Sequence, residues 1–181
     1  IIGAGMAGAS LAAELAPAGS VLILEAEEFP GYHATGRSAA FWSETYGGPM
    51  IQPLTSASHE FLATPPRAFS ERPFLNRNGA LHIAEKSGYD SLAGLAADFE
   101  ASDVTLEPVS RSALVEICPG LRSNWDRAIW EPSCADIDVG GLHQAYLRAA
   151  RQSGAQLRCS APVTAIEPHE GGWRIFAGSE W

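Results

Sequence analysis

Three glycines near the start of the chain have the spacing of a phosphate-binding turn. Gly3, Gly5 and Gly8 follow two isoleucines in the pattern G-x-G-x-x-G. Gly3 permits a tight turn after a strand, Gly5 lets a pyrophosphate approach the backbone, and Gly8 lets helix and strand pack closely. The N–H groups at the helix start would then face the phosphates, where the helix dipole favours negative charge. The pattern predicts a dinucleotide site.

The segment after the glycines supports this prediction. Residues 7–16 are rich in alanine and leucine, as expected for a helix packed on a sheet, and residues 21–24 form a short apolar run typical of a buried parallel strand. Glu25 ends that run, 22 residues after Gly3, where an acid accepts hydrogen bonds from a ribose in such folds. The alternative for Glu25 is a solvated acid at a strand end.

A second helix start is predicted at residues 35–41, with either Thr35 or Ser38 as its N-cap. It would bring further N–H groups, and the side chain of Arg37, near the first phosphate site. The alternative for Arg37 is an ordinary surface arginine.

Composition limits the partners and the location. The 181 residues include 12 Lys and Arg against 21 Asp and Glu, a formal net charge of −9. Nucleic acid and anionic membrane surfaces are disfavoured, because they require a basic footprint. No apolar run approaches the roughly 20 residues of a membrane span. The three cysteines lack metal-ligand spacing, which favours reduced thiols, no metal site and a cytoplasmic location, with peripheral membrane association left open.

The predicted elements give an α/β fold in two parts. Residues 1–41 and 139–181 are expected to form a Rossmann-like domain with a parallel sheet. Residues 42–138 do not continue the βαβ alternation, so they are expected to be an inserted α+β substrate region. Helices are predicted within 49–63, 90–101, 111–118 and 142–150, and strands at 128–130, 156–159, 163–167 and 173–176. A hairpin with its turn at Asn78-Gly79 is predicted between residues 74–75 and 80–84.

The chain opens within its first predicted strand and stops at residues 178–181, inside a predicted hairpin. We therefore expect it to be part of a longer protein, truncated at its C-terminus.

Three stretches carry a family resemblance. They are residues 1–25, residues 30–40 (PGYHATGRSAA), and residues 136–138 with the helical stretch 142–150 (LHQAYLRAA). Together they resemble the FAD-dependent D-amino-acid oxidase and dehydrogenase family, which includes glycine oxidase and sarcosine oxidase. The first stretch is shared with many flavoproteins, whereas the second is similar to the loop that wraps the flavin in this family. The spacing is closest to that of D-arginine dehydrogenases, over nearly the whole chain.

The resemblance implies FAD as the cofactor and assigns residues to it. Those implied to line the pyrophosphate are Gly3, Gly5, Ala7 and Gly8, and those at the adenosine ribose are Glu25 and Ala26. Those implied to contact the pyrophosphate and the isoalloxazine ring are Ala34, Thr35, Gly36, Arg37, Ser38, Ala39, Ala40 and Phe41. Val163 would offer backbone hydrogen bonds to adenine.

The resemblance also implies where substrate would bind. Tyr46 and Phe41 would lie at the substrate; the alternative for Tyr46 is an ordinary half-buried tyrosine. The arginine that clamps the substrate carboxylate in relatives is expected beyond the end of this chain, so no catalytic residue is assigned. The 181 residues alone are expected to bind FAD weakly or not at all, and to be inactive.

The implied activity is oxidation of the Cα–N bond of a D-amino acid or related amine by hydride transfer to flavin N5, giving an imino acid and then a 2-oxo acid. Phe41 replaces a histidine of D-arginine dehydrogenases, and residues 79–80 lack their substrate-pairing acid. A buried guanidinium needs an anionic partner, so a neutral or apolar amine is expected. The alternatives are an FAD-dependent 2-hydroxy-acid dehydrogenase of the same superfamily and a nucleotide-binding module without redox activity. The electron acceptor is left open.

Overall fold

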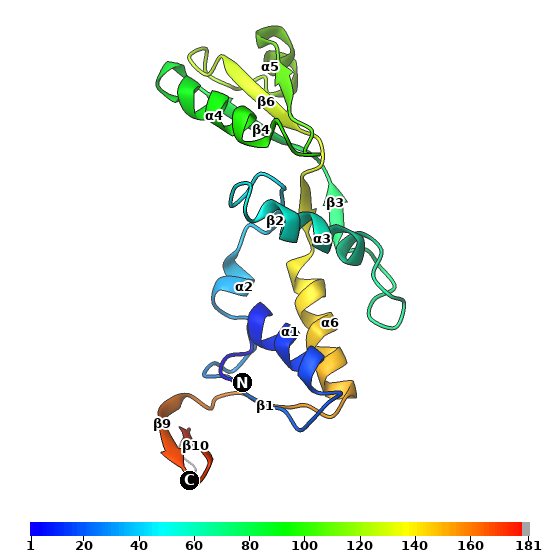
Figure 1. Cartoon of the computed structure of the whole chain (residues 1–181), viewed down its shortest axis with the longest axis vertical. Helices are drawn as coiled ribbons and strands as arrows, with labels where there is room; N and C mark the ends of the chain where they lie inside the picture. The colour runs from blue at the N-terminus through cyan, green and yellow to red at the C-terminus, as the bar shows by residue number, and fades with distance from the viewer. Residues whose placement is uncertain (179–181) are drawn as a thin grey trace. The chain divides into compact units, whose positions relative to one another are not determined.

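The structure, a computed structural model, describes residues 1–178, and these form two compact units (Figure 1). Unit 1 comprises residues 1–39, 66–71 and the chain from residue 138 onward. Unit 2 comprises residues 40–65 and 72–137. The predicted end of the chain at residues 179–181 lies outside the described residues.

Unit 1 contains the predicted parallel sheet. Ile2 forms a parallel bridge with Leu24 at the end of β1 (Leu22–Leu24), and β1 pairs in parallel with β8 (Gln156–Arg158). The remaining elements are α1 (Met6–Leu15), the single turn α2 (Ala34–Arg37), α6 (Val139–Gln152), and the antiparallel hairpin of β9 (Val163–His169) and β10 (Gly172–Ala177). The predicted α/β class is confirmed by this parallel pairing and by the mixture of helices and strands.

Small residues let α1 and α6 pack closely in unit 1 (Figure 1). Ala9 and Ala12 of α1 are fully buried in one cluster with Leu147 and Ala150 of α6 and with Ile23 of β1. Burying a large aliphatic side chain such as Ile23 or Leu147 contributes about 1.5–3 kcal/mol relative to leaving it exposed. The cluster therefore holds the start of α1, and the glycine turn before it, against the sheet.

The beginning of α6 is capped by a side chain. The Oδ1 atom of Asp138 accepts a hydrogen bond from the N–H of Gly141 at 2.8 Å, which satisfies one of the donors that a helix start leaves without an intrahelical partner. After α6 the chain turns at Gly154, whose φ of +92° lies in the left-handed region that glycine favours.

Unit 2 is an α+β arrangement of two three-stranded antiparallel sheets. Its elements are β2 (Phe41–Trp42), α3 (Gln52–Ala63), β3 (Leu75–Arg77), β4 (Ala80–Ala84), the 3₁₀ turn η1 (Lys86–Gly88), α4 (Tyr89–Phe99), β5 (Glu107–Val109), α5 (Arg111–Ile117), β6 (Arg127–Glu131) and β7 (Ala135–Ile137). The strand orders are β2-β7-β3 and β4-β6-β5. In Figure 1, α4 runs along β4 and β6, which it contacts.

The hairpin predicted around Asn78-Gly79 is wrong. β3 pairs with β7 and β4 pairs with β6, so the two strands belong to different sheets. The N–H groups of Asn78 and Gly79 both donate to the carbonyl of Cys134, at 3.3 and 2.9 Å. Residues 78–79 therefore cross from one sheet to the other, next to the point where the chain passes from β6 to β7. A local turn signal was outweighed by pairing with strands that lie far away in the sequence.

None of the helices within residues 1–178 has both the length and the apolar character needed to cross a membrane. In the same part of the chain, no three His, Cys, Asp or Glu side chains are grouped to hold a metal ion, and Cys118, Cys134 and Cys159 are free.

Candidate functional site

The glycine turn of unit 1 is shaped by close backbone contacts. Gly3 has a φ of +88°, which an L side chain rarely adopts. A Cβ on Gly8 would lie 1.9 Å from the carbonyl oxygen of Gly3, so only glycine lets α1 start this close to the turn. A Cβ on Gly5 would lie 3.2 Å from Oγ1 of Thr35. Gly3 and Gly8 are thus each required for a separate steric reason, whereas at Gly5 a larger residue would make the Thr35 side chain shift.

The start of α1 offers backbone donors. Gly5 is its N-cap and has no side chain with which to cap the helix. The N–H of Met6 donates to Oγ1 of Thr35 at 2.9 Å, which ties the 34–37 turn to the helix start. Ala7 and Gly8 complete the first turn, where N–H groups point toward an anion placed at the helix end.

Glu25 lies beneath the same turn. Its side chain is buried, with Oε2 accepting from the N–H of Ala4 at 2.7 Å and Oε1 accepting from the N–H of Glu27 at 3.0 Å. Burial alone would raise the pKa of Glu25, but these backbone hydrogen bonds, with a smaller one from Ala26, outweigh it and hold the pKa below the ordinary 4.5. A carboxylate has about four acceptor positions. With the bonds from Ala4, Glu27 and Ala26, about one position is left, which suits a hydroxyl donor such as that of a ribose.

The chain between β8 and β9 returns to this acid. The N–H of Ala161 donates to the carbonyl of Glu25 at 2.8 Å, and the N–H of Ser160 donates to the carbonyl of Glu27 at 2.9 Å. Val163 follows as the first residue of β9. The structure therefore brings Val163, Glu25 and the glycine turn into one region of unit 1, although they are distant in sequence.

The predicted second helix is shorter than expected. α2 ends at Arg37, and Ser38 is extended, with φ −84° and ψ 135°. The predicted caps are wrong: His33 occupies the N-cap position, and Thr35 lies inside the turn, where its hydroxyl is used by Met6. The Thr35 hydroxyl therefore makes a tertiary contact with Met6 and does not cap its own helix.

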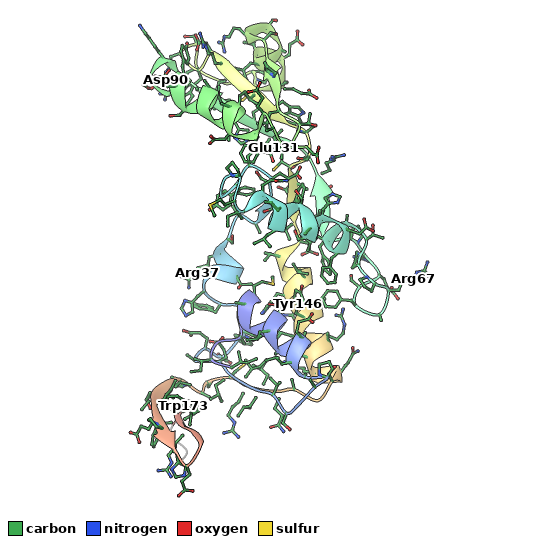
Figure 2. All side chains as sticks on the ribbon, viewed as in Figure 1. Arg37, Arg67, Asp90, Glu131, Tyr146 and Trp173 are labelled. Atoms are coloured by element: carbon green, nitrogen blue, oxygen red, sulfur yellow. The ribbon has the colours of Figure 1, made fainter. Side chains whose placement is uncertain are left out.

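The loop around α2 remains accessible. Ala34, Gly36, Ser38 and Ala39 are exposed. Arg37, labelled in Figure 2, places its guanidinium 4.7 Å from the ring centre of Tyr32, a cation–π contact. Ala40 belongs to unit 2, where its carbonyl accepts from Ile137.

His143 is a residue of this site that sequence reasoning assigned only to the surface or the core. It is 3% exposed, and its Nε2 donates to the carbonyl of Ala4 at 2.7 Å. A Cβ on Gly31 would lie 2.9 Å from its ring, so His143 also packs against the 30–40 loop. Its position next to Leu142, on the buried face of a helix, was the signal that could have identified it.

The two residues predicted to meet substrate lie together in unit 2. Phe41 is 47% exposed and Tyr46 is 72% exposed. Their ring centres are 5.6 Å apart and the rings meet edge to face, at 83°. They form an exposed aromatic pair, and Tyr46 is not the half-buried residue of the alternative prediction.

The crowded glycine turn, the N–H groups at the start of α1 and the buried acid beneath them fit the pyrophosphate and ribose of a dinucleotide. They define a nucleotide-binding α/β protein. Comparison with protein families makes this specific: residues 1–180 match the family of FAD dependent oxidoreductases, called DAO. The chain belongs to this family, and FAD is accordingly its class of cofactor.

Solved structures agree on the fold. Glycine oxidase from Geobacillus kaustophilus is 22% identical, with a TM-score of 0.81 over 98% of this chain and 52% of its own. NikD, an amino acid oxidase of nikkomycin biosynthesis, is 25% identical, with a TM-score of 0.79 over 97% of this chain and 46% of its own. Iminodiacetate oxidase from Chelativorans sp. BNC1 is 26% identical, with a TM-score of 0.72 over 97% of this chain and 50% of its own. The chain spans about half the length of these proteins. The finer likeness to D-arginine dehydrogenases stays a prediction.

Proposed function

We propose that unit 1 holds FAD and that the complete protein oxidises the Cα–N bond of an amino acid or related amine. The observation that carries the proposal is the glycine turn, which Glu25 and His143 hold through Ala4 from two sides. FAD, when bound, supplies the acceptor for the hydride that leaves the substrate Cα. With loss of a proton from nitrogen the amine becomes an imine, and water then releases ammonia and a 2-oxo acid.

The residues of unit 1 would each hold one part of the cofactor. The first turn of α1 would bind the pyrophosphate through backbone N–H groups, and Glu25 would accept hydrogen bonds from the ribose. Val163 would meet adenine through its backbone, and the exposed 34–40 loop would meet the pyrophosphate and the isoalloxazine ring. In this proposal residues 1–41 and 139–181 are the FAD domain, and residues 42–138 are the substrate region.

We propose a neutral or apolar D-amino acid, or a related amine, as the substrate. Phe41 and Tyr46 present aromatic rings, which offer apolar contact area and supply no anionic partner. At Gly79 a Cβ would lie 2.0 Å from the ring of Trp130, so an acidic side chain does not fit there. A cationic substrate would lack its anionic partner at this position.

An anaerobic titration of the full-length protein tests the proposal. The oxidised flavin should absorb at about 450 nm, and neutral D-amino acids should bleach this band and release ammonia on turnover. Bleaching by 2-hydroxy acids without ammonia would favour the hydroxy-acid alternative, and a protein that takes up no FAD would contradict the proposal. A highest kcat/KM with D-arginine would contradict the substrate class alone.

A further inference from the structure

Glu131 is a fully buried carboxylate that the proposed chemistry does not use. It is the last residue of β6 and is 0% exposed, in the second unit (labelled in Figure 2). Removing a charge from water is costly unless partners compensate for it. The donors around Glu131 therefore indicate what it holds in place.

Three of those donors come from one short segment, residues 43–45. The hydroxyls of Ser43 and Thr45 donate to Oε2 of Glu131 at 3.1 and 2.7 Å, and the N–H of Glu44 donates to Oε1 at 2.9 Å. Ser43 and Thr45 are themselves buried. The segment is thus fixed along its whole length to an acid 86 to 88 residues away.

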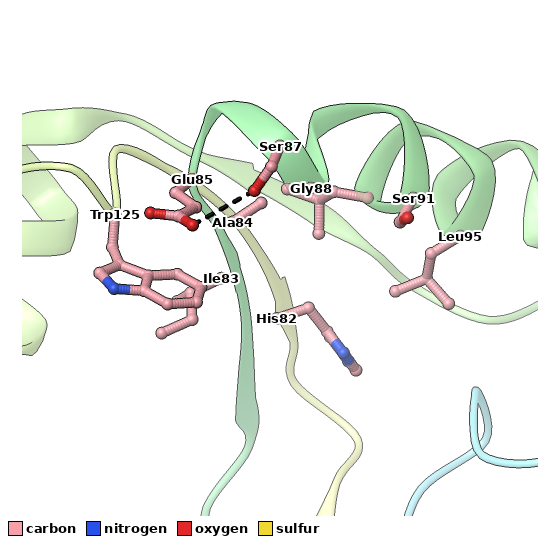
Figure 3. A pocket seen from close by; sticks show the side chains of 10 residues that line it. His82, Ile83, Ala84, Glu85, Ser87, Gly88, Ser91, Leu95 and Trp125 are labelled. Atoms are coloured by element: carbon pink, nitrogen blue, oxygen red, sulfur yellow. Dashed lines mark hydrogen bonds between the residues drawn. The ribbon is translucent and has the colours of Figure 1, made fainter.

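The fourth donor is His82 of β4, whose Nε2 donates to Oε2 of Glu131 at 2.9 Å. His82 also borders an open cavity of about 360 Å³, together with Ser87, Leu95 and Trp125 (Figure 3). Burial alone would raise the pKa of Glu131, but the hydrogen bonds from His82, both hydroxyls and the backbone hold it below the ordinary 4.5. The carboxylate is therefore charged at neutral pH and accepts all of these bonds.

The anchored segment carries the exposed aromatic pair. Trp42 points inward on one side of it, where its Nε1 donates to the carbonyl of Thr55 at 2.9 Å. Tyr46 directly follows Thr45, and its N–H donates to the carbonyl of Ser43 at 3.4 Å. Inward residues from Trp42 to Thr45 thus hold the backbone, while Phe41 and Tyr46 project outward.

We propose that Glu131 is a positioning residue for substrate: by binding the 43–45 segment it sets the place of Tyr46. This inference rests on the proposed role of Tyr46 at the substrate. A displaced ring would weaken ground-state contact with the substrate, and FAD binding in unit 1 would be unaffected. The effect is therefore expected in KM more than in kcat or in the flavin dissociation constant.

A double-mutant cycle tests the coupling in the full-length holoprotein. Thr45→Val removes one donor to Glu131 and keeps the side-chain shape, and Tyr46→Ala removes the ring. The substrate is the amino acid that reduces the flavin fastest in the titration above. KM should rise about tenfold in Thr45→Val, because this variant loses a hydrogen bond to a charged group. In the Tyr46→Ala background the same substitution should leave KM unchanged. Ser102→Ala, which loses a hydroxyl bonded to the backbone of the same unit, is the control and should leave KM unchanged.

Hydrogen exchange supplies a readout that needs no substrate. The amides of residues 43–48 should exchange faster in Thr45→Val than in the wild type, whereas those of α4 should not change. If Tyr46→Ala leaves KM unchanged, the substrate role of Tyr46 and the proposed function at this site are wrong. If Tyr46→Ala raises KM but Thr45→Val changes neither KM nor exchange, the inference about Glu131 alone is wrong.

Discussion

Glu25 in unit 1 and Glu131 in unit 2 are both buried acids, and they are held in different ways. Glu25 is 8% exposed and accepts from the backbone N–H groups of Ala4 and Glu27. Glu131 is 0% exposed and accepts from the backbone N–H of Glu44 and from three side chains. The first acid supports a backbone turn, and the second gathers side chains from separate strands and loops.

This difference predicts which substitutions destabilise each region. Backbone donors survive most side-chain substitutions, so the turn above Glu25 should be sensitive chiefly to added bulk. Side-chain donors disappear with the residue that carries them, so the segment at Glu131 should be sensitive to polar substitutions. The following experiments test this contrast, each in the full-length protein.

The largest effect is expected for Glu131→Gln. The amide nitrogen cannot accept the bonds that a carboxylate oxygen takes from Ser43, Thr45 and His82. Breaking a buried, hydrogen-bonded charge site costs about 3–5 kcal/mol of unfolding free energy. Urea unfolding at neutral pH measures this loss of unfolding free energy. Glu107→Gln, at an exposed position of β5, is the control and should stay within about 0.5 kcal/mol of the wild type. Equal urea midpoints for Glu131→Gln and Glu107→Gln would contradict the contrast drawn between Glu131 and Glu25.

The next effect is expected for Gly8→Ala in unit 1. The added methyl would lie 1.9 Å from the carbonyl of Gly3, so the turn must shift. Overpacking of this kind costs about 1–3 kcal/mol, and FAD affinity should fall because the helix start moves. Urea unfolding and fluorescence titration with FAD measure the two effects. Gly19→Ala, where a Cβ has no neighbour within 4 Å, is the matched control. An unchanged FAD affinity in Gly8→Ala would argue against the turn as the phosphate site.

A smaller effect is expected at His143. His143→Leu loses the donor to the carbonyl of Ala4, a bond worth about 1 kcal/mol, or about fivefold in FAD dissociation constant. His143→Gln keeps a donor and should restore part of the affinity. His169→Leu, at an exposed position of β9, is the control. If His143→Leu and His143→Gln bind FAD as tightly as the wild type does, His143 contributes only to core packing.

The smallest effect concerns acid stability. The pKa values of Glu25 and Glu131 are both held below the ordinary 4.5, so the unfolded chain binds more protons at acid pH. Their contribution to stability is complete above about pH 4.5 and is lost as pH falls through the folded-state pKa values. Urea midpoints measured from about pH 6 to about pH 3 should fall less steeply in Glu131→Gln than in the wild type. Parallel curves would contradict the lowered pKa of Glu131.

Unit 1 was the more predictable region. The glycine spacing predicted a turn followed by a helix, and Glu25 stood at the expected distance, because both belong to one continuous βαβ segment. In unit 2 the turn signal at Asn78-Gly79 misled, since β3 and β4 find their partners in β7 and β6 rather than in each other. The predicted caps at Thr35 and Ser38 failed for a similar reason, because the Thr35 hydroxyl bonds Met6, 29 residues away.

The sequence by itself determined the class of fold, the family and the glycine turn before α1. Those follow from short-range rules, in which backbone conformation and helix starts depend on residues a few positions apart. Only the tertiary structure decided the roles of His143 and Glu131. His143 meets Ala4 across 139 residues, and Glu131 meets Thr45 across 86. A buried polar side chain must find partners wherever the fold brings donors and acceptors together, and no local pattern along the chain specifies that meeting.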